Sequence, residues 1–329
     1  MDNVPVIDLT RSFSGDEAGR QAVAEAIRDA CEEIGFFTIV GHGVPDKTIE
    51  DLKNGARAFF ALPLEEKQKI PTPVERNSRG YSHVGSRALG QSTGAVTPYD
   101  LQESFAMGPI DPAPADLNDT ELERYFFMRN MWPDAPAGFA AAFQTYYRAM
   151  EGLSLHIVQL FARALGLDDH YFDDKLDHHT STMRTVYYPP QSVPLKDGQL
   201  RAGVHTDYGT LTILTGDDVP GGLQVKTRNG GWVDVHPAPN AFVCNIGDLM
   251  MRWTNDKWVS NPHRVANPPP EFAHIGRLSI PFFHNPNLDA EIRCIRAFYG
   301  TDEKEKYPPI RFGEYYRSRH LKATLAKAV

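Results

Sequence analysis

The chain places an imidazole and a carboxylate two residues apart, in His205-Thr206-Asp207. On a β-strand, residues i and i+2 project from the same face, so both side chains point the same way. Another histidine, His263, opens a strand-like run further along the chain. If the two strands belong to one barrel, two imidazoles and one carboxylate can bind one face of a metal ion. The short His-x-Asp pattern alone is weak evidence, because a chain with 12 histidines produces such pairs by chance.

An arginine and a hydroxyl repeat the two-residue spacing after the last of these histidines, in Arg277-Leu278-Ser279. A planar guanidinium binds a carboxylate through two parallel hydrogen bonds, and the hydroxyl adds a further donor. The His-x-Asp pair, the later histidine and the Arg-x-Ser pair are much less likely to occur together in this order by chance than any one of them alone. Two histidines and one carboxylate leave the opposite face of a metal open, as in the facial triad of non-haem iron(II) oxygenases. There the open positions take a chelating co-substrate and O₂.

The elements that must position these residues are predicted to be short strands of an antiparallel barrel or jelly roll. From Thr180 onward, runs rich in β-forming residues alternate with turn signals such as Gly221-Gly222. The expected strands cover residues 182–188, 211–215, 222–227, 232–236, 242–246, 264–267 and 277–283. Asn245–Asp248 is expected to be a tight turn near the metal.

The N-terminal half reads as helices around a few strands. Apolar residues recur with helical spacing in four segments, and runs of β-forming residues occur in three others. We expect helices over 16–34, from 47 to about 62, over 136–165 and over 312–327, with strands over 4–9, 36–40 and 101–107. Residues 71–120 are rich in Pro, Gly, Ser and Asp and are expected to be mostly irregular. No linker divides the chain, so we expect one α+β domain over 1–329, with the jelly-roll core at 180–290 and an N-terminal region at 1–120.

Composition excludes several classes of protein. The chain has 329 residues, ordinary hydrophobic content of 41% and a net charge of −8, so it lacks the basic footprint of a nucleic-acid-binding protein. No run approaches the roughly 18 apolar residues of a membrane span, and the first residues do not resemble a signal peptide. Three distant cysteines suggest neither a zinc site nor a disulfide framework. We therefore expect a reduced, cytoplasmic protein; the oligomeric state cannot be read from the sequence.

The chain resembles the isopenicillin N synthase-like group of 2-oxoglutarate- and iron(II)-dependent dioxygenases. The resemblance extends over nearly the whole chain and rests on motifs in both halves. In the N-terminal half they are 4–9, 35–44 and 59–63; in the catalytic half they are 205–212, 221–225, 245–248, 263–265 and 277–280. The resemblance implies a double-stranded β-helix, or jelly roll, backed by helices. It also implies iron(II) bound by His205, Asp207 and His263, with 2-oxoglutarate as co-substrate and O₂ as oxidant.

The resemblance further assigns a co-substrate site. Arg277, Ser279 and Tyr188 would hold the distal carboxylate of 2-oxoglutarate, whose keto and C1 carboxylate oxygens chelate the iron. Tyr188 precedes Pro189 and aligns with the co-substrate tyrosine of the family. Members often carry Asn two residues before it, where this chain has Val186, so one expected polar contact is missing.

Substrate-facing residues are predicted from resemblance and from the position of loops only. The candidates are Tyr81 and His83 in the irregular segment, Phe105 on a short strand and Phe283 after the Arg277 strand. The 71–120 segment would act as a lid over the barrel mouth. Its aromatic residues, without a cluster of Lys or Arg, favour a mostly apolar or ring-bearing substrate that is hydroxylated, desaturated or cyclised.

Three alternatives remain open from the sequence. Isopenicillin N synthase-like and aminocyclopropane-carboxylate-oxidase-like members use no 2-oxoglutarate, and their Arg–Ser pair binds the carboxylate of the substrate itself. A catalytically silent jelly-roll binding module would keep the fold without turnover. A zinc hydrolase is disfavoured, because no motif places a general base beside the triad.

Overall fold

In the computed structural model the described residues are 4–73, 79–94, 97–110, 120–191, 194–300 and 304–324. Two sheets form the centre of the molecule. The larger sheet has eight strands in the order β1-β2-β10-β7-β12-β5-β4-β3, and the smaller has four in the order β6-β11-β8-β9. The larger comprises β1 (Val6–Asp8), β2 (Phe36–Val40), β3 (Gly80–Ser82), β4 (Glu103–Met107), β5 (Thr182–Tyr188), β7 (Leu211–Gly216), β10 (Phe242–Ile246) and β12 (Arg277–His284). The smaller comprises β6 (Ala202–His205), β8 (Leu223–Lys226), β9 (Trp232–Asp234) and β11 (His263–Val265).

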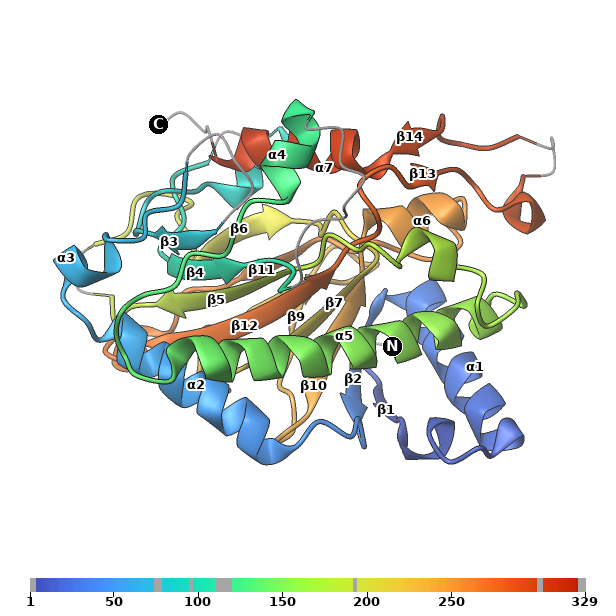
Figure 1. Ribbon diagram of the computed structural model, residues 1–329, viewed down its shortest axis with the longest axis horizontal. Helices are drawn as coiled ribbons and strands as arrows, with labels where there is room; N and C mark the ends of the chain where they lie inside the picture. The colour runs from blue at the N-terminus through green and yellow to red at the C-terminus, as the bar shows by residue number, and fades with distance from the viewer. Residues whose placement is uncertain are drawn as a thin grey trace.

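Helices cover the outer face of the larger sheet. The long helix α5 (Phe139–Ala164) crosses the sheet diagonally, with α2 (Asp46–Phe60) and α1 (Glu17–Glu33) beside it (Figure 1). Its buried residues recur every three or four positions, as in Phe143, Tyr146 and Met150, so one apolar face packs on the sheet. Asp16 caps the start of helix α1, because its carboxylate accepts a hydrogen bond from the Gly19 N–H. Because these helices cover the outer face of the larger sheet, the site lies between the inner faces of the two sheets.

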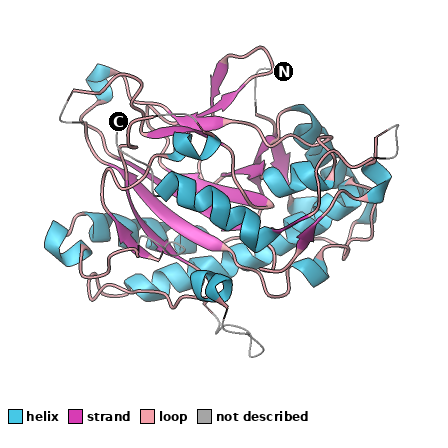
Figure 2. Cartoon of the chain, turned by 90° about the horizontal axis from the view of Figure 1, so that it is seen from above, coloured by secondary structure: helices cyan, strands magenta, loops and turns pink. Residues whose placement is uncertain are grey.

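Short elements lie at the opposite side of the strands from α2 and α5. Helices α4 (Glu121–Phe126) and α7 (Phe312–Thr324) lie near the strands β3 and β6, and the small sheet of β13 (Glu291–Ile292) and β14 (Ile310–Arg311) lies beside them (Figure 1). Seen from above, helices flank the strands on more than one side (Figure 2). The remaining short helices are α3 (Leu64–Lys67) and α6 (Asp248–Trp253). Within the described residues, no helix is both long and apolar enough to cross a membrane.

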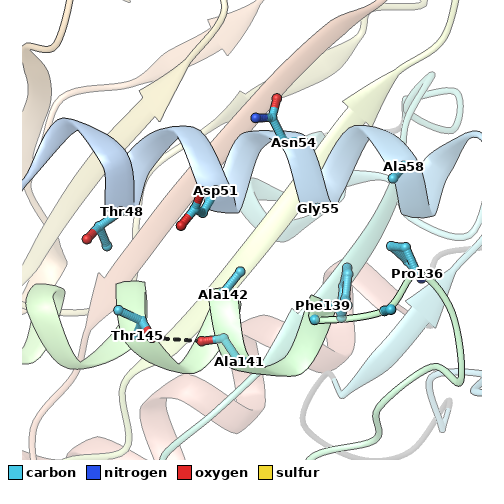
Figure 3. A pocket seen from close by; sticks show the side chains of 12 residues that line it. Thr48, Asp51, Asn54, Gly55, Ala58, Pro136, Phe139, Ala141, Ala142 and Thr145 are labelled. Carbon is cyan, nitrogen blue, oxygen red and sulfur yellow. Dashed lines mark hydrogen bonds between the residues drawn. The ribbon is translucent and has the colours of Figure 1, made fainter.

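Helices α2 and α5 leave a surface groove of about 500 Å³ between them (Figure 3). Several of the residues that line it are small, including Gly55, Ala58, Ala141 and Ala142. Because these side chains do not fill the space between the two helices, the groove stays open. The groove lies on the helix-covered face of the sheet, away from the histidines and Asp207. It is therefore separate from the site described below.

Most predicted elements are confirmed, and the differences are local. Strands β5 and β10 have the predicted bounds, and the helices predicted at 16–34 and 136–165 form as α1 and α5. The strand assumed at His205–Asp207 is confirmed only in part: His205 ends the short strand β6, and Asp207 lies beyond it. The tight turn expected at Asn245–Asp248 is shorter than predicted: Asn245 belongs to β10, Asp248 begins α6, and only Gly247 connects the two elements.

Candidate metal centre and the two hollows beside it

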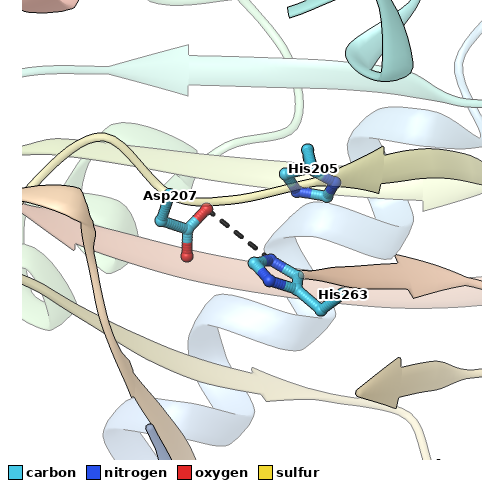
Figure 4. A group of neighbouring side chains, drawn as sticks. All are labelled: His205, Asp207 and His263. Carbon is cyan, nitrogen blue, oxygen red and sulfur yellow. Dashed lines mark ion pairs between the residues drawn. The ribbon is translucent and has the colours of Figure 1, made fainter. Parts of the chain in front are cut away.

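The two histidines and the aspartate meet between the sheets. His205 ends β6 and His263 begins β11, and the antiparallel pairing of these strands makes the two residues direct partners. Their ring centroids are 4.3 Å apart. Asp207 follows β6 and brings Oδ1 to 3.7 Å from His263 Nε2 (Figure 4). One ligand atom from each residue lies within 4.8 Å of the others, as a shared metal ion requires.

Backbone carbonyls orient both imidazoles. His205 Nδ1 donates to the Gly203 carbonyl at 2.7 Å, and His263 Nδ1 donates to the Asn261 carbonyl at 3.1 Å. A carbonyl only accepts, so the proton of a neutral ring sits on Nδ1 and the Nε2 lone pair remains for a metal. Burial, followed by the neighbouring His263, lowers the pKa of His205 to about 4. This ring is therefore neutral at pH 7.

Two donors hold one oxygen of Asp207 and leave the other oxygen exposed to the site. Thr212 Oγ1 donates to Oδ2 at 2.6 Å, and Asn245 Nδ2 donates to the same atom at 2.7 Å. Burial alone would raise the pKa of Asp207, but His263, His205 and these hydrogen bonds lower it overall. The carboxylate is thus ionised and aimed through Oδ1. Two imidazoles and one carboxylate oxygen are a donor set that suits iron(II).

An inner hollow of about 70 Å³ extends from the triad between the sheets. Tyr188, Val186 and Ser279 from the larger sheet line it, opposite Ala202 and Val265 from the smaller one. The expected polar contact at position 186 is absent, and the side chain there forms an apolar wall instead.

Arg277 lies beside this hollow. It pairs directly with Tyr188 across β12 and β5, and its guanidinium carbon is 5.6 Å from the centre of the tyrosine ring. Nε and Nη1 are buried and form no hydrogen bond within the described part of the chain. The side chain also borders a groove lined by Gly222 and Leu223. A buried guanidinium with unused donors is costly unless a ligand satisfies it, so Arg277 fits a carboxylate-binding role.

An outer hollow, also about 70 Å³, extends from the other side of the triad toward α7. It shares with the inner hollow the residues Leu89, Arg184, His205, Asp207 and Phe283. The triad therefore lies where the two hollows meet. The other residues that line the outer hollow come from several elements and are Arg87, Thr182, Thr206, Tyr208, Gly209, Asn285, Tyr316, His320 and Ala323.

Of the four residues predicted to face the substrate, one lines the hollows and three do not. Phe283 lines both hollows. Tyr81 and Phe105 are buried and pack in the main core, with Phe105 against Phe139 of α5. His83 is exposed, and its Nδ1 bonds the Val84 carbonyl at 2.8 Å. The prediction for Tyr81, His83 and Phe105 is thus corrected: they lie outside both hollows.

Sequence reasoning missed the two arginines of the outer hollow. Arg184 lies four residues before Tyr188 on β5 and shares its face, so strand alternation could have identified it. Arg87 comes from the irregular segment, and His320 comes from α7. Nothing in the spacing of these two residues indicates that they meet, because only the tertiary fold brings the two segments together.

The comparisons with known proteins agree with this geometry. One family model, described as the non-haem dioxygenase in morphine synthesis N-terminal, matches residues 4–135, and another, the 2OG-Fe(II) oxygenase superfamily, matches residues 179–286. The 2-oxoglutarate-Fe(II) type oxidoreductase hxnY of Emericella nidulans is 32% identical over 96% of this chain and 89% of its own. The proline hydroxylase buaE of Petromyces alliaceus is 34% identical over 96% of this chain and 98% of its own.

Solved structures show the same relationship. A full-length Neurospora crassa protein, crystallised with alpha-KG and thymine, superposes with a TM-score of 0.82 at 32% identity, covering 97% of this chain and 96% of that one. The sequence-based expectations of a jelly-roll fold, of Fe(II) and 2-oxoglutarate as cofactors and of a small-molecule substrate are confirmed at the level of the family. The chain therefore belongs to the 2-oxoglutarate- and iron(II)-dependent dioxygenases, which oxidise small molecules within a double-stranded β-helix.

Proposed function

We propose that His205, Asp207 and His263 bind the iron of this enzyme and that Arg277, with Ser279 and Tyr188, binds the distal carboxylate of 2-oxoglutarate. The observation that carries the metal assignment is the asymmetric environment of Asp207. Thr212 and Asn245 occupy Oδ2, so that Oδ1 is the oxygen left for a metal beside two Nε2 lone pairs. Oδ1 instead faces the imidazoles, 3.7 Å from His263 Nε2, which is the arrangement that a shared metal ion requires.

The assignment of the 2-oxoglutarate site rests on the inner hollow. Its wall is apolar around Val186 and Ala202, and its polar groups, Tyr188 and Ser279, lie near the buried guanidinium of Arg277. A dicarboxylate can reach from the triad to this end with its distal carboxylate satisfying donors that otherwise have no partner. When bound, iron with 2-oxoglutarate and O₂ supplies the oxidant for a substrate C–H bond, while 2-oxoglutarate leaves as succinate and CO₂.

The substrate would occupy the outer hollow, with hydroxylation as the outcome we favour over desaturation or cyclisation. Phe283 lies at the junction of the two hollows, and Tyr208 and Tyr316 line the outer one. These rings support a small, ring-bearing substrate held next to the triad. Burial of the surrounding residues also keeps bulk water from the site, which limits wasteful side reactions. We further propose that the whole chain, 1–329, acts as one catalytic domain.

Oxygen consumption tests the proposal. Purified protein is loaded with Fe(II), and O₂ uptake is followed with and without 2-oxoglutarate, together with succinate formation. Uptake that requires 2-oxoglutarate, with equal amounts of succinate formed, is the expected result. Uptake without it would favour the oxidases that bind only their own substrate's carboxylate. Absence of both iron binding and turnover would favour a silent binding module.

A further inference from the structure

Asp100 lies deep in the protein, beside the strand that carries His205. Its side chain is 2% exposed. Oδ1 accepts a hydrogen bond from the Gly203 N–H at 2.8 Å, and Oδ2 accepts one from the Leu89 N–H at 2.9 Å. Gln102 Nε2 also donates to Oδ2, at 3.2 Å. One buried carboxylate therefore joins strand β6 to the segment around Leu89.

The hydrogen bond to Gly203 continues to the metal centre. His205 Nδ1 donates to the Gly203 carbonyl at 2.7 Å. The residue that Asp100 holds through its N–H is thus the residue that orients the imidazole through its carbonyl. Glycine has more backbone freedom than any other residue, so an outside hydrogen bond is needed to restrict its motion. Two hydrogen bonds and one glycine backbone therefore link Asp100 to the imidazole of His205.

Strand β6 also approaches the short helix Leu89–Thr93 too closely for a side chain at position 203. A Cβ on Gly203 would lie 2.9 Å from Gly90 N and 3.2 Å from Gly90 Cα. The backbones of the strand and of the short helix are therefore in contact. Asp100 accepts from both of them at this contact, which fixes the position of one relative to the other.

The segment that Asp100 holds forms part of the wall of both hollows. Leu89 lines the inner and the outer hollow, and Arg87 lines the outer one. The Arg87 carbonyl accepts from the Asp100 N–H at 2.8 Å. Burial raises the pKa of Asp100 to about 6, which leaves the carboxylate mostly ionised at pH 7. Burial also lowers the pKa of Arg184 and Arg87, and the negative charge of Asp100 opposes that lowering.

We propose that Asp100 is a positioning residue of the reaction, which fixes the orientation of His205 through Gly203. The same carboxylate keeps the wall at Leu89 at a constant distance from that ligand. Asp100 itself is not among the described residues that line either hollow, so it acts only through the groups that it bonds. This inference rests on the proposed function, because it requires His205 to bind the metal.

Asp100→Asn tests the proposal, because asparagine has the same shape but only one accepting oxygen. The backbone partners at Gly203 and Leu89 are both N–H donors, so the amide nitrogen of the variant must face one of them. Mn(II) affinity is measured by calorimetry, which needs no turnover. Loss of a hydrogen bond that supports a metal ligand typically weakens metal binding by about 10–100-fold, and we expect a rise in the Mn(II) Kd within this range. An unchanged Kd in the folded variant would overturn the proposal.

Glu103→Gln is the matched control, because it makes the same carboxylate-to-amide change three residues further along the chain. Glu103 is also buried, and its Oε2 accepts from Tyr81 and Lys67. It is not among the described residues that line the hollows. The control should lose stability, as measured by urea denaturation, and should bind Mn(II) as tightly as the wild type. An equal loss of Mn(II) affinity in both variants would assign the effect to lost charge or lost stability, against the proposal.

Gly203→Ala reaches the same link from its other end. The added methyl group would press β6 away from Gly90, so this variant should also bind Mn(II) more weakly. Because both changes act on one link, the double variant that combines Asp100→Asn with Gly203→Ala should bind Mn(II) no more weakly than the weaker single variant. Additive losses would show that Asp100 does not act through Gly203. Asp100→Ser, whose single oxygen can reach at most one of the two N–H groups, takes the place of Asp100→Asn if that variant does not fold.

The visible absorption of Co(II)-loaded protein reports ligand orientation directly, because the d–d bands of Co(II) depend on how its ligands are arranged. These bands should shift in Asp100→Asn and should match the wild type in Glu103→Gln. Titration of the wild type with Mn(II) and then 2-oxoglutarate separates the two levels of the argument. If the wild type binds neither, the proposed function itself fails. If it binds both and Asp100→Asn binds Mn(II) equally well, the positioning role fails and the proposed function stands.

Discussion

His205 and His263 are direct partners across β6 and β11, and their ring centroids lie 4.3 Å apart. Strand pairing, rather than loop geometry, thus sets the separation of the two imidazoles. Each ring is also held by the backbone carbonyl two residues before it, that of Gly203 for His205 and that of Asn261 for His263. Because the scaffold places the ligands before a metal arrives, little conformational entropy has to be lost on binding.

His263→Ala should remove metal binding and activity while the fold persists, because it deletes one of three ligands without touching the helices that form the main core. Metal that binds only the folded state raises stability by about 2.7 kcal/mol at a concentration 100 times its Kd. Mn(II) should therefore raise the Tm of the wild type by roughly 5 °C, and should leave that of His263→Ala unchanged. His170→Ala, at an exposed histidine, is the control. A normal metal content in His263→Ala would show that the third ligand is assigned wrongly.

Asn245→Ala and Thr212→Val should weaken metal binding without removing a ligand. Both residues hold Asp207 Oδ2, and loss of such supporting hydrogen bonds typically costs about 10–100-fold in metal affinity. The measurement is a Mn(II) titration, which does not depend on turnover. Thr215→Val is a matched control, since Thr215 lies on the same strand as Thr212 but on its other face. Unchanged affinity in both variants would mean that Asp207 is oriented by the strand alone.

Arg277→Lys should raise the KM for 2-oxoglutarate by more than tenfold. Lysine keeps the charge but loses the planar pair of donors, and a hydrogen bond to a charged group contributes roughly 1.5–3 kcal/mol. Steady-state kinetics with varied 2-oxoglutarate measure the change. Arg264→Lys serves as the control, because Arg264 stacks on Trp232 outside the site. If KM is the same in wild type and Arg277→Lys, the distal carboxylate is bound elsewhere.

Strand alternation explains which site residues the sequence could identify. On β12, Arg277, Ser279 and Phe283 share one face, and the residues between them, such as Phe282, pack in the core. Tyr188 was indicated by the family resemblance and not by strand alternation; the structure shows that it pairs with Arg277. A two-residue period predicts which residues share a face, but it does not say which face looks into the barrel.

Strand β4 shows the limit of that reasoning. Phe105 was expected to face the substrate, yet its neighbour Ser104 pairs with Val186 and contacts Arg184, so Ser104 is on the side of the hollows. Phe105 therefore faces α5. The sequence contains no signal that decides between the two faces, since both are buried in β4. Only the packing of α5 against the larger sheet decides it.

Phe105→Ala should destabilise the fold and leave specificity unchanged. Phe105 contacts Phe59, Phe139 and Phe143, so its truncation leaves a core cavity and should cost about 3–5 kcal/mol in the free energy of unfolding. Urea denaturation measures this loss. Phe283→Ala is the contrasting variant, which should alter substrate KM or product pattern instead. A changed product pattern in Phe105→Ala, at full stability, would return this residue to the substrate site.

Tyr81→Phe should have a smaller effect on stability. The Tyr81 hydroxyl donates to Glu103 Oε2 at 2.6 Å, and Lys67 donates to the same oxygen at 2.8 Å. The variant removes one of two donors to a buried carboxylate, which should cost about 1–3 kcal/mol. Urea denaturation and 2-oxoglutarate turnover are measured together. A large rise in substrate KM without loss of stability would contradict the core placement of Tyr81.

His156 should make the fold sensitive to mild acid. Its ring stacks on Phe13 at 4.0 Å between centroids, and its Nε2 lies 2.8 Å from Ser12 Oγ. Burial, followed by the charge of Arg20, lowers its pKa to about 4. An unfolded chain takes up this proton near pH 6.5, whereas the folded chain resists it until about pH 4. The stability that the neutral ring contributes is therefore complete above pH 6.5 and is lost as the pH falls toward 4.

His156→Gln isolates this contribution, because glutamine keeps a hydrogen-bond donor for Ser12 and does not titrate. Between pH 7 and pH 5, the free energy of unfolding should fall by ~1 kcal/mol more in the wild type than in the variant, a modest difference because the ring is only partly buried. Urea denaturation at the two pH values gives both changes. Because other groups that titrate in this range are common to both proteins, their effects cancel in the comparison. Parallel losses in the two proteins would show that His156 takes up its proton in the folded state as readily as in the unfolded one.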